Sequence, residues 1–374
     1  MVLNNPIILN ESEENEILTF TINNINISLA NALRRVILSN IPCIVIKSQP
    51  YSENKINIRK NTTRLNNELI KQRISSIPIF VDDIENFPYD NYTIEINKYN
   101  ETTEMAYITT EDIKIKNNKL NTYLSSSETK KMFPPDNITG DYIDILRLRS
   151  KYSEYTEGLE LSATLSISNA SEDGTFNVVS TCSYGFTPDN LKIKENLDKY
   201  EKEIKSKENI TKERIEFLKK DWMLLHSKKS YLENSFDFII ETIGIYNNSK
   251  IIDMASSIIM NKLVKTLETF KNDNTLIEEK NDNTLPNVFT LKLLNEDYTV
   301  GKILEYYFHE KYFKELESIN YVGFIKYHPH DNYSIIKISF KEILSKDDII
   351  LLIEEAVNYS NKQFLVIKQH FENF

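Results

Sequence analysis

The sequence contains one pattern twice, and this repeat restricts the chain to folds built from two similar halves. Residues 17–36 and 288–307 align without gaps, and in both an alternating apolar and polar segment precedes apolar residues at helical spacing. The matched positions are Thr19 with Thr290, Asn24 with Asn295, Ser28 with Thr299, Leu29 with Val300, Ala30 with Gly301, and Leu33 with Leu304. Two strand–helix units with apolar helix faces can pack as a pseudo-twofold pair that buries both faces.

Secondary structure around the first copy follows from the same patterns. We expect a strand over residues 17–22, a helix with Ser28 as its N-cap that stops before Pro42, and a strand over residues 41–46. Residues 51–184 consist of short strand-like pieces separated by Asn, Ser, Thr and Pro, which indicates an inserted β-rich domain. The alternating charges of residues 189–221 are typical of a solvated helix pair.

The first half should close with a strand over residues 236–243 and a long amphipathic helix. The apolar row of this helix consists of Ile252, Ala255, Ile259, Leu263, Leu267 and Phe270. Such a face needs a partner to cover it. Residues 271–287 have the composition of an exposed linker. We then expect a strand over 288–293, a helix capped by Thr299, strands near 321–325 and 334–340, and a final helix from about 346 to 368.

Composition argues against several classes of function. A formal net charge of -10 and a pI near 5.3 repel polyanions, so we expect no direct nucleic-acid binding. Gly301-Lys302 lacks the first Gly and the following Ser or Thr of a phosphate-binding loop. Residues 1–16 are polar and acidic, and no apolar stretch is long enough to span a membrane. We therefore expect an intracellular protein without membrane association.

No arrangement of residues predicts catalysis or a metal site. Cys43 and Cys182 have no further Cys or His at ligand spacing, so both are expected to be buried, reduced thiols. The His-Pro-His of residues 328–330 favours a turn at a strand edge over a metal pair, since no third ligand is nearby. The aspartate pairs suit a turn (82–83) and the first turn of the final helix (347–348), where the helix dipole favours carboxylates. We expect no catalytic residue and no cofactor.

Residues 26–42 read Asn-Ile-Ser-Leu-Ala-Asn-Ala-Leu-Arg-Arg-Val-Ile-Leu-Ser-Asn-Ile-Pro. This segment resembles the signature of bacterial alpha, archaeal D and the eukaryotic third-largest RNA polymerase subunit. Residues 65–79 resemble the element that opens the inserted domain of that family, with Asn67, Gln72 and Ser75 in place of the usual Asp, His and Gly. Residues 236–270 are similar to the strand and long helix that close its dimerisation domain.

The remainder of the chain resembles archaeal L and the eukaryotic eleventh subunit, which pairs with the third-largest one. Residues 297–304 match the helix start of that family, and residues 322–329 match its Gly-Tyr…Pro-His-Pro strand. Val300, Lys302 and Tyr327 depart from its usual Leu, Asn and Pro. Fusion of both partners in one chain is similar to the arrangement in large DNA viruses of eukaryotes, and the Asn, Ile and Lys bias suits an AT-rich genome.

The resemblance implies an α+β fold with two dimerisation domains packed as an intramolecular pseudo-heterodimer. An alpha-like or D-like domain would comprise residues 1–50 and 185–270, interrupted by the inserted β-rich domain of residues 51–184. A linker of residues 271–287 would lead to an L-like domain of residues 288–374. The predicted seam between the two domains consists of Leu29, Leu33, Val36, Val300, Leu304 and Tyr307.

By the same resemblance, the chain is a non-catalytic assembly scaffold of a multisubunit DNA-directed RNA polymerase. Its expected partners are the two largest subunits, which jointly hold the catalytic Mg²⁺, and small polymerase subunits; no homo-oligomer is expected. A viral subunit would be found in the virion and in the host cytoplasm. The alternative is a stand-alone protein-interaction module with the same fold.

The resemblance also implies which residues bind partners. They are Asn31, Arg34, Arg35, Glu68 and Arg73. In the family the arginine pair, and the position of Arg35 above all, helps to dock a largest-subunit partner, and a guanidinium suits bidentate pairing at an interface. A solvated helix face is the alternative interpretation of Arg34 and Arg35. Two arginines on an acidic chain make a poor phosphate track.

The cysteine spacing predicts that the purified chain carries neither zinc nor iron. Archaeal relatives often hold a cysteine-ligated cluster in the inserted domain, whereas Cys182 is the only cysteine within residues 51–184. One thiolate cannot hold such a cluster. Elemental analysis should therefore find no stoichiometric zinc or iron, and a stoichiometric amount of either metal would contradict the argument.

Overall fold

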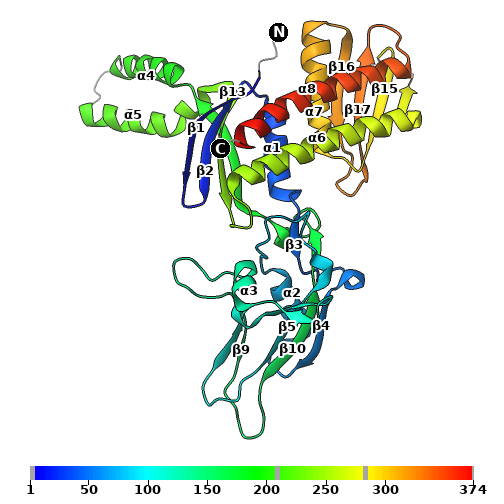
Figure 1. Cartoon of the computed structure of the whole chain (residues 1–374). Helices are drawn as coiled ribbons and strands as arrows, with labels where there is room; N and C mark the ends of the chain where they lie inside the picture. Colours follow the sequence, from blue (N-terminus) through cyan, green and yellow to red (C-terminus); the bar gives the residue numbers. More distant parts are fainter. Residues whose placement is uncertain (1–4, 207–210, 281–284, 373–374) are drawn as a thin grey trace. The chain divides into compact units, whose positions relative to one another are not determined.

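A computed structural model describes residues 5–206, 211–280 and 285–372 of the chain (Figure 1). The chain divides into two compact units. Unit 1 contains Met1–Ile37, Thr181–Glu241 and Asn248–Phe374, and unit 2 contains Leu38–Ser180 and Thr242–Asn247. The long segment of unit 2 therefore interrupts unit 1 in the sequence.

The first sheet of unit 1 has the strand order β1-β2-β13-β12. Its strands are β1 (Ile7–Glu14), β2 (Ile17–Asn23), β13 (Tyr231–Thr242) and β12 (Val179–Pro188). On β2 the alternate residues Leu18, Phe20 and Ile22 are buried, because successive side chains of a strand point to opposite faces. Phe20 lies opposite Phe238 of β13, and their ring centroids are 5.2 Å apart in a stacked arrangement.

The second sheet of unit 1 repeats this order as β14-β15-β17-β16. Its strands are β14 (Ile277–Lys280), β15 (Val288–Leu294), β17 (Tyr333–Phe340) and β16 (Ile319–Ile325). Helices α1 (Ile27–Ser39) and α6 (Asn248–Asn272) belong to the first half, and α7 (Tyr298–Tyr307) and α8 (Lys346–Glu372) belong to the second. Each half thus runs strand, strand, helix, strand, strand, helix. In the first half, unit 2 and the helices α4 (Asn190–Lys205) and α5 (Lys212–Leu225) interrupt this order.

The repeat predicted from the sequence is confirmed position by position. β2 and β15 are both seven residues long and begin and end at aligned residues, and α1 and α7 begin at aligned residues. The aligned Asn24 and Asn295 both have left-handed backbones, with φ of 60° and 55°, a conformation that Asn tolerates well. Gly301 is aligned with Ala30, but a Cβ at Gly301 would lie 2.0 Å from a ring carbon of Phe324. The close packing against this ring therefore requires glycine in the second half.

Both helix caps lie earlier than the sequence patterns predict. The side chain of Asn26 accepts a hydrogen bond from the backbone N–H of Ser28 (2.8 Å), and that of Asp297 accepts one from the backbone N–H of Thr299 (2.9 Å). Asn and Asp side chains reach the amide two residues further along the chain and are strong caps. They take the role predicted for Ser28 and Thr299, and that prediction is wrong.

The edge strands β1 and β14 are also absent from the sequence predictions. β14 falls within residues 271–287, so the prediction of a linker is wrong for Ile277–Lys280. Ile277 is fully buried and lies opposite Leu291 of β15. An edge strand can carry many charged side chains, because these discourage its exposed row of backbone groups from pairing with another chain. Its sequence therefore carries little strand signal.

Unit 2 is built on a five-stranded antiparallel sheet with the order β4-β10-β5-β7-β8. The strands are β4 (Ile56–Asn61), β10 (Gly158–Thr164), β5 (Tyr92–Tyr99), β7 (Lys114–Asn117) and β8 (Thr122–Tyr123). Two strand pairs and two helices complete the unit: β3 (Cys43–Val45) with β11 (Ser166–Ser168), β6 (Ala106–Thr109) with β9 (Asp144–Leu148), α2 (Asn67–Ser75) and α3 (Ser126–Met132). Its core is rich in isoleucine.

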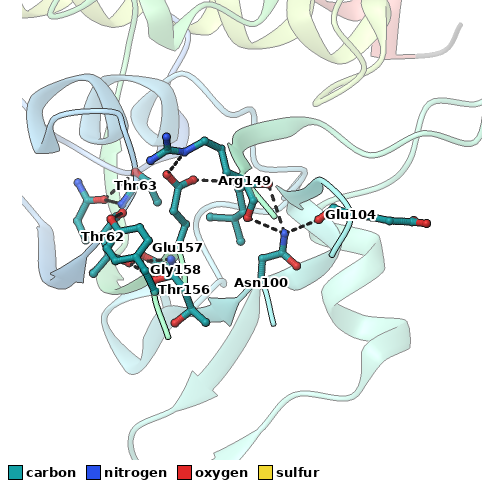
Figure 2. A network of polar contacts seen from close by, with 11 residues as sticks. Thr62, Thr63, Asn100, Glu104, Arg149, Thr156, Glu157 and Gly158 are labelled. Carbon is teal, nitrogen blue, oxygen red and sulfur yellow. Dashed lines mark hydrogen bonds and ion pairs between the residues drawn. The ribbon is translucent and has the colours of Figure 1, made fainter. Parts of the chain in front are cut away.

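A buried carboxylate organises the loops of unit 2 (Figure 2). The side chain of Glu157 is 1% exposed, and its oxygens accept hydrogen bonds from the Arg149 backbone N–H (2.7 Å) and the Arg149 Nε (2.6 Å). The amide of Asn100 donates to the carbonyls of Glu104 and Arg149, both at 2.8 Å. Buried polar groups are costly unless they are paired. This network therefore holds the loop between β5 and β6, which contains Asn100, against the loop between β9 and β10, which contains Arg149 and Glu157. Arg149 pairs with both carboxylate oxygens, so Glu157 has a structural role.

In unit 1, helices α6 and α8 pack along each other and join the two halves (Figure 1). The apolar row predicted on α6 is buried along its whole length. The facing row of α8 includes Ile349, Ile353, Ala356, Val357, Phe364 and Ile367, all buried. Near the end of α8, the Phe371 ring packs edge-on against Phe20 of β2, with centroids 5.1 Å apart. The last helix of the second half therefore also contacts the sheet of the first half.

Charged pairs lie near both ends of this helix pair. Lys271 of α6 contacts Glu354 of α8 at 2.8 Å, and Asp253 of α6 lies 3.5 Å from Lys368 of α8. The later residue of α6 thus meets the earlier residue of α8, so the two helices are antiparallel.

Cleavage between α6 and β15 should leave the two fragments associated. A protease site placed at residues 281–284 cuts the second half after its edge strand β14, so the pairing of β14 with β15 crosses the cut together with the packing of α6 on α8. Each large apolar side chain that stays buried contributes roughly 1.5–3 kcal/mol, whereas the intact link adds only effective concentration. The fragments should co-elute in size-exclusion chromatography, and separate elution would contradict the packing.

A matched pair of substitutions on α6 tests the same interface. Leu263→Asp buries an unpaired charge at a position that is 0% exposed, so it should separate the cleaved fragments or unfold them. Val264→Asp changes the next residue, which is 40% exposed, and should leave the fragments together. Equal elution profiles for the two variants would contradict the assignment of the buried face.

Candidate partner-binding site

Helix α1 presents one apolar and one polar face. Leu29, Leu33 and Val36 are buried, as the helical spacing predicts. On the half-buried polar side, the Asn31 Oδ1 accepts hydrogen bonds from the Arg34 Nε (3.0 Å) and Nη2 (2.9 Å). Asn31 therefore holds the planar guanidinium of Arg34 in one orientation on the helix surface.

Arg35 connects α1 to the start of α7. Its Nε donates to the Thr299 Oγ1 at 3.0 Å, and its Nη2 forms a short ion pair with the Asp297 carboxylate. Asp297 also caps α7 through the Thr299 backbone N–H. One carboxylate thus holds both the beginning of α7 and the guanidinium from the first half. The two copies of the sequence repeat contact each other at this point.

The electrostatic environment favours the charged form of Asp297. Burial acts to raise the pKa of its carboxyl group, but the Thr299 backbone hydrogen bond and the Arg35 guanidinium outweigh burial and hold the pKa below its ordinary value. The side chains of Arg35 and Asp297 are 33% and 38% exposed. Solvent screening therefore keeps the contribution of this pair modest.

All six residues of the predicted seam are buried in unit 1. They are Leu29, Leu33, Val36, Val300, Leu304 and Tyr307. Tyr307 also contacts α8, where its ring centroid lies 5.2 Å from that of Tyr359.

The two remaining predicted partner-binding residues, Glu68 and Arg73, lie on α2 in unit 2. Arg73 donates to the backbone carbonyls of Ile145 (2.5 Å) and Asp144 (2.7 Å), so it holds strand β9 against the helix. Glu68 is exposed in the first turn of α2 and borders a polar pocket of about 340 Å³. The predicted residues are therefore divided between the units: Asn31, Arg34 and Arg35 belong to unit 1.

The cysteines are packed as small apolar groups. Burial raises the pKa of Cys43 and of Cys182 to about 12, against a weaker lowering effect of Arg34 on Cys182. Within the described ranges there is no group of three or more His, Cys, Asp and Glu side chains suited to a metal ion. The backbone N–H groups of His328 and His330 are hydrogen-bonded within a turn, to Asp331 and to the His328 ring. No helix of the described part of the chain is long and apolar enough to cross a lipid bilayer.

The sequence patterns do not identify Asp297 and Thr299 as partners of Arg35. A helix start with a capping carboxylate is a local feature, and its sequence does not reveal which distant side chain approaches it. The only available signal is the repeat, in which Asp297 aligns with Asn26 and adds a negative charge at the equivalent cap. That charge faces the positive end of α7, which favours it further.

The two halves of unit 1 thus have the same strand and helix order and pack through their final helices. A family model described as the RNA polymerase Rpb3/Rpb11 dimerisation domain matches residues 19–263, which is more than half of the chain. The chain belongs to this family and is an alpha-like RNA polymerase subunit.

The match begins within β2 and ends within α6. It therefore covers unit 2 and most of the first half, while the resemblance of residues 288–374 to archaeal L stays a prediction. The family consists of non-catalytic polymerase subunits, and membership implies interaction with other RNA polymerase subunits in DNA-directed transcription.

A double-mutant cycle should detect the link between Arg35 and Asp297. Asp297→Asn keeps a good helix cap but removes the charge, and Arg35→Ala removes the donor. The coupling free energy at pH 7, measured by urea unfolding, should be about 0.5–1 kcal/mol for this partly exposed pair.

The same cycle should depend on pH. Because the folded state lowers the pKa of Asp297, its stabilisation is present above the unfolded pKa of about 4 and is lost as the pH falls through the lower folded value. A coupling that persists unchanged at acidic pH, or is absent at pH 7, would contradict the ion pair.

Proposed function

We propose that the chain is an assembly scaffold of a multisubunit DNA-directed RNA polymerase that carries both halves of an alpha-like heterodimer in one polypeptide. The repeated order of strands and helices in unit 1 is the observation that supports this most strongly. The antiparallel packing of α6 on α8 and the contact of Arg35 with the start of α7 join the halves as subunits of a heterodimer would be joined. In this proposal the protein contributes no catalytic residue.

The proposed partners are the two largest polymerase subunits, together with small subunits. Asn31 and Arg34 offer them an oriented guanidinium on the surface of α1, and such a group can pair bidentately with a carboxylate. Arg35 already contacts Asp297 and Thr299 within the chain. To bind a partner, its guanidinium would have to keep only part of these contacts or give them up. The net charge of -10 favours protein partners over nucleic acid. We further propose an intracellular site of action, which for a viral subunit includes the virion.

Co-expression with the two largest polymerase subunits of the same source tests the proposal. The tagged wild-type chain should recover both subunits, and Arg35→Glu should lose them, because a reversed charge at an interface costs about 2–5 kcal/mol. Lys341→Glu carries the same charge change at an exposed position of the second half and should recover them normally. If the wild-type chain recovers neither subunit, the scaffold proposal fails in favour of a stand-alone interaction module.

A charge swap separates the two roles of Arg35. The double variant Arg35→Glu with Asp297→Arg restores an intrachain ion pair of opposite polarity but keeps the reversed charge on α1. Because the swap also removes the cap of α7, the single variant Asp297→Ala is the control and should still recover the large subunits. Continued loss in the double variant, with recovery in this control, supports docking through Arg35. Full recovery would assign Arg35 to the intrachain contact and leave docking on α1 to Arg34 and Asn31.

A further inference from the structure

A pocket of about 400 Å³ lies where α6 of the first half meets the end of β15 and the turn that follows it. We call it the α6–β15 pocket, and it is defined by Lys262, Lys265, Phe270, Lys292, Leu294 and Glu296. Its wall combines segments from the two halves of unit 1. Its volume falls in the range of pockets that bind small ligands or a few amino-acid residues.

The charge of this pocket is opposite to that of the whole chain. Lys262, Lys265 and Lys292 line it, and Glu296 is the only acidic residue of the lining. The Lys292 Nζ lies 4.3 Å from the ring centroid of Tyr333, and a cation–π contact of this kind holds the ammonium group in place. Burial raises the pKa of Glu296 against the opposing effect of Lys262. The pocket therefore attracts anionic groups.

Glu296 is paired within the wall of the pocket. Its Oε2 atom is buried in the protein, and the Lys262 Nζ lies 3.8 Å away, which is an ion pair but too far for a hydrogen bond. This ion pair offsets part of the charge of Lys262 and leaves Lys265 and Lys292 to attract a ligand.

The apolar part of the wall narrows the choice of ligand. Leu294, which is 42% exposed, and the buried Phe270 line the pocket together with the lysines. An ionised phosphate offers hydrogen-bond acceptors alone, so it would satisfy the lysines but leave Leu294 uncovered. A peptide with acidic and aliphatic side chains offers carboxylates to the lysines and an apolar group to Leu294.

We propose that the α6–β15 pocket binds an acidic segment of a partner polypeptide. The inference rests on the proposed function, in which the partners are other polymerase subunits. It assigns to the junction of the two halves a docking site separate from the arginines of α1.

A titration of the purified full-length chain tests the pocket by itself. The probe is a short fluorescein-labelled peptide of alternating Glu and Leu, with binding followed by fluorescence anisotropy. The double variant Lys265→Glu with Lys292→Glu should bind at least about tenfold more weakly, since it turns attraction into repulsion. Lys341→Glu is the matched control and should bind as the wild-type chain does.

Two further measurements test which chemical groups of the ligand the pocket recognises. A peptide of alternating Gln and Leu should bind at least about tenfold more weakly than the acidic one, because it lacks the carboxylates. Inorganic phosphate at the same concentration should not displace the acidic peptide. Lys265→Gln with Lys292→Gln, which removes charge without adding a repulsive one, should also weaken binding and serves if the charge-reversed chain does not fold.

The proposal is overturned if the lysine variants bind the acidic peptide as tightly as the wild-type chain, if the Gln peptide binds equally well, or if phosphate displaces the peptide. Because this titration needs no other subunit, its failure is distinct from a failure of the largest subunits to co-purify. If the wild-type chain does not bind the acidic peptide, the pocket proposal fails and the scaffold proposal stays in place.

Discussion

The two halves of unit 1 depend on the burial of α6 against α8. Each helix carries an apolar row that is buried, and the two helices pack against each other in an antiparallel arrangement. Near the two ends of the helix pair, Lys271 contacts Glu354 and Asp253 contacts Lys368. Both ion pairs are consistent with a single antiparallel alignment of α6 and α8. Apolar burial supplies most of the free energy, while the charged pairs restrict the alignment. Phe371 then reaches the first sheet at Phe20, so the second half helps to complete the core of the first.

Around this apolar contact, polar groups join the beginnings of the two repeated helices. Asp297 caps α7 and pairs with Arg35 of α1, so one carboxylate stabilises a local helix start and a long-range contact. For function, this means that a partner would compete with Asp297 for the guanidinium of Arg35. A partner that pairs with Arg35 must share or displace Asp297, whereas Arg34 is already oriented by Asn31 at the surface. Under the proposed function, docking of the subunit and cohesion of its halves are coupled through these adjacent arginines.

Sequence patterns predicted the central strands and helices of the two repeated units, but not the residues that cap their helices or the strands at the edges of their sheets. The strands and helices with strong apolar periodicity, such as β2, β15 and α6, were predicted because periodicity reports directly which face is buried. The caps were placed at Ser28 and Thr299, although Asn26 and Asp297 fill that role, since several adjacent polar residues are plausible caps. β14 was interpreted as a linker because an edge strand can be largely polar. Asn31, Arg34 and Arg35 were predicted to bind partners through family resemblance, not through any pattern of charge, and this stays a prediction.

The sequence by itself determined that the chain has two similar halves, which faces of their helices are apolar, and that its charge favours protein partners. These properties are periodic or additive, so they can be evaluated without knowing which segments meet. Only the tertiary structure decided that Arg35 pairs with Asp297, and that lysines of α6 and β15 line one pocket with Glu296. Periodicity specifies that a face must be covered but not which segment covers it. Contacts between residues distant in sequence therefore arise only when the whole unit packs.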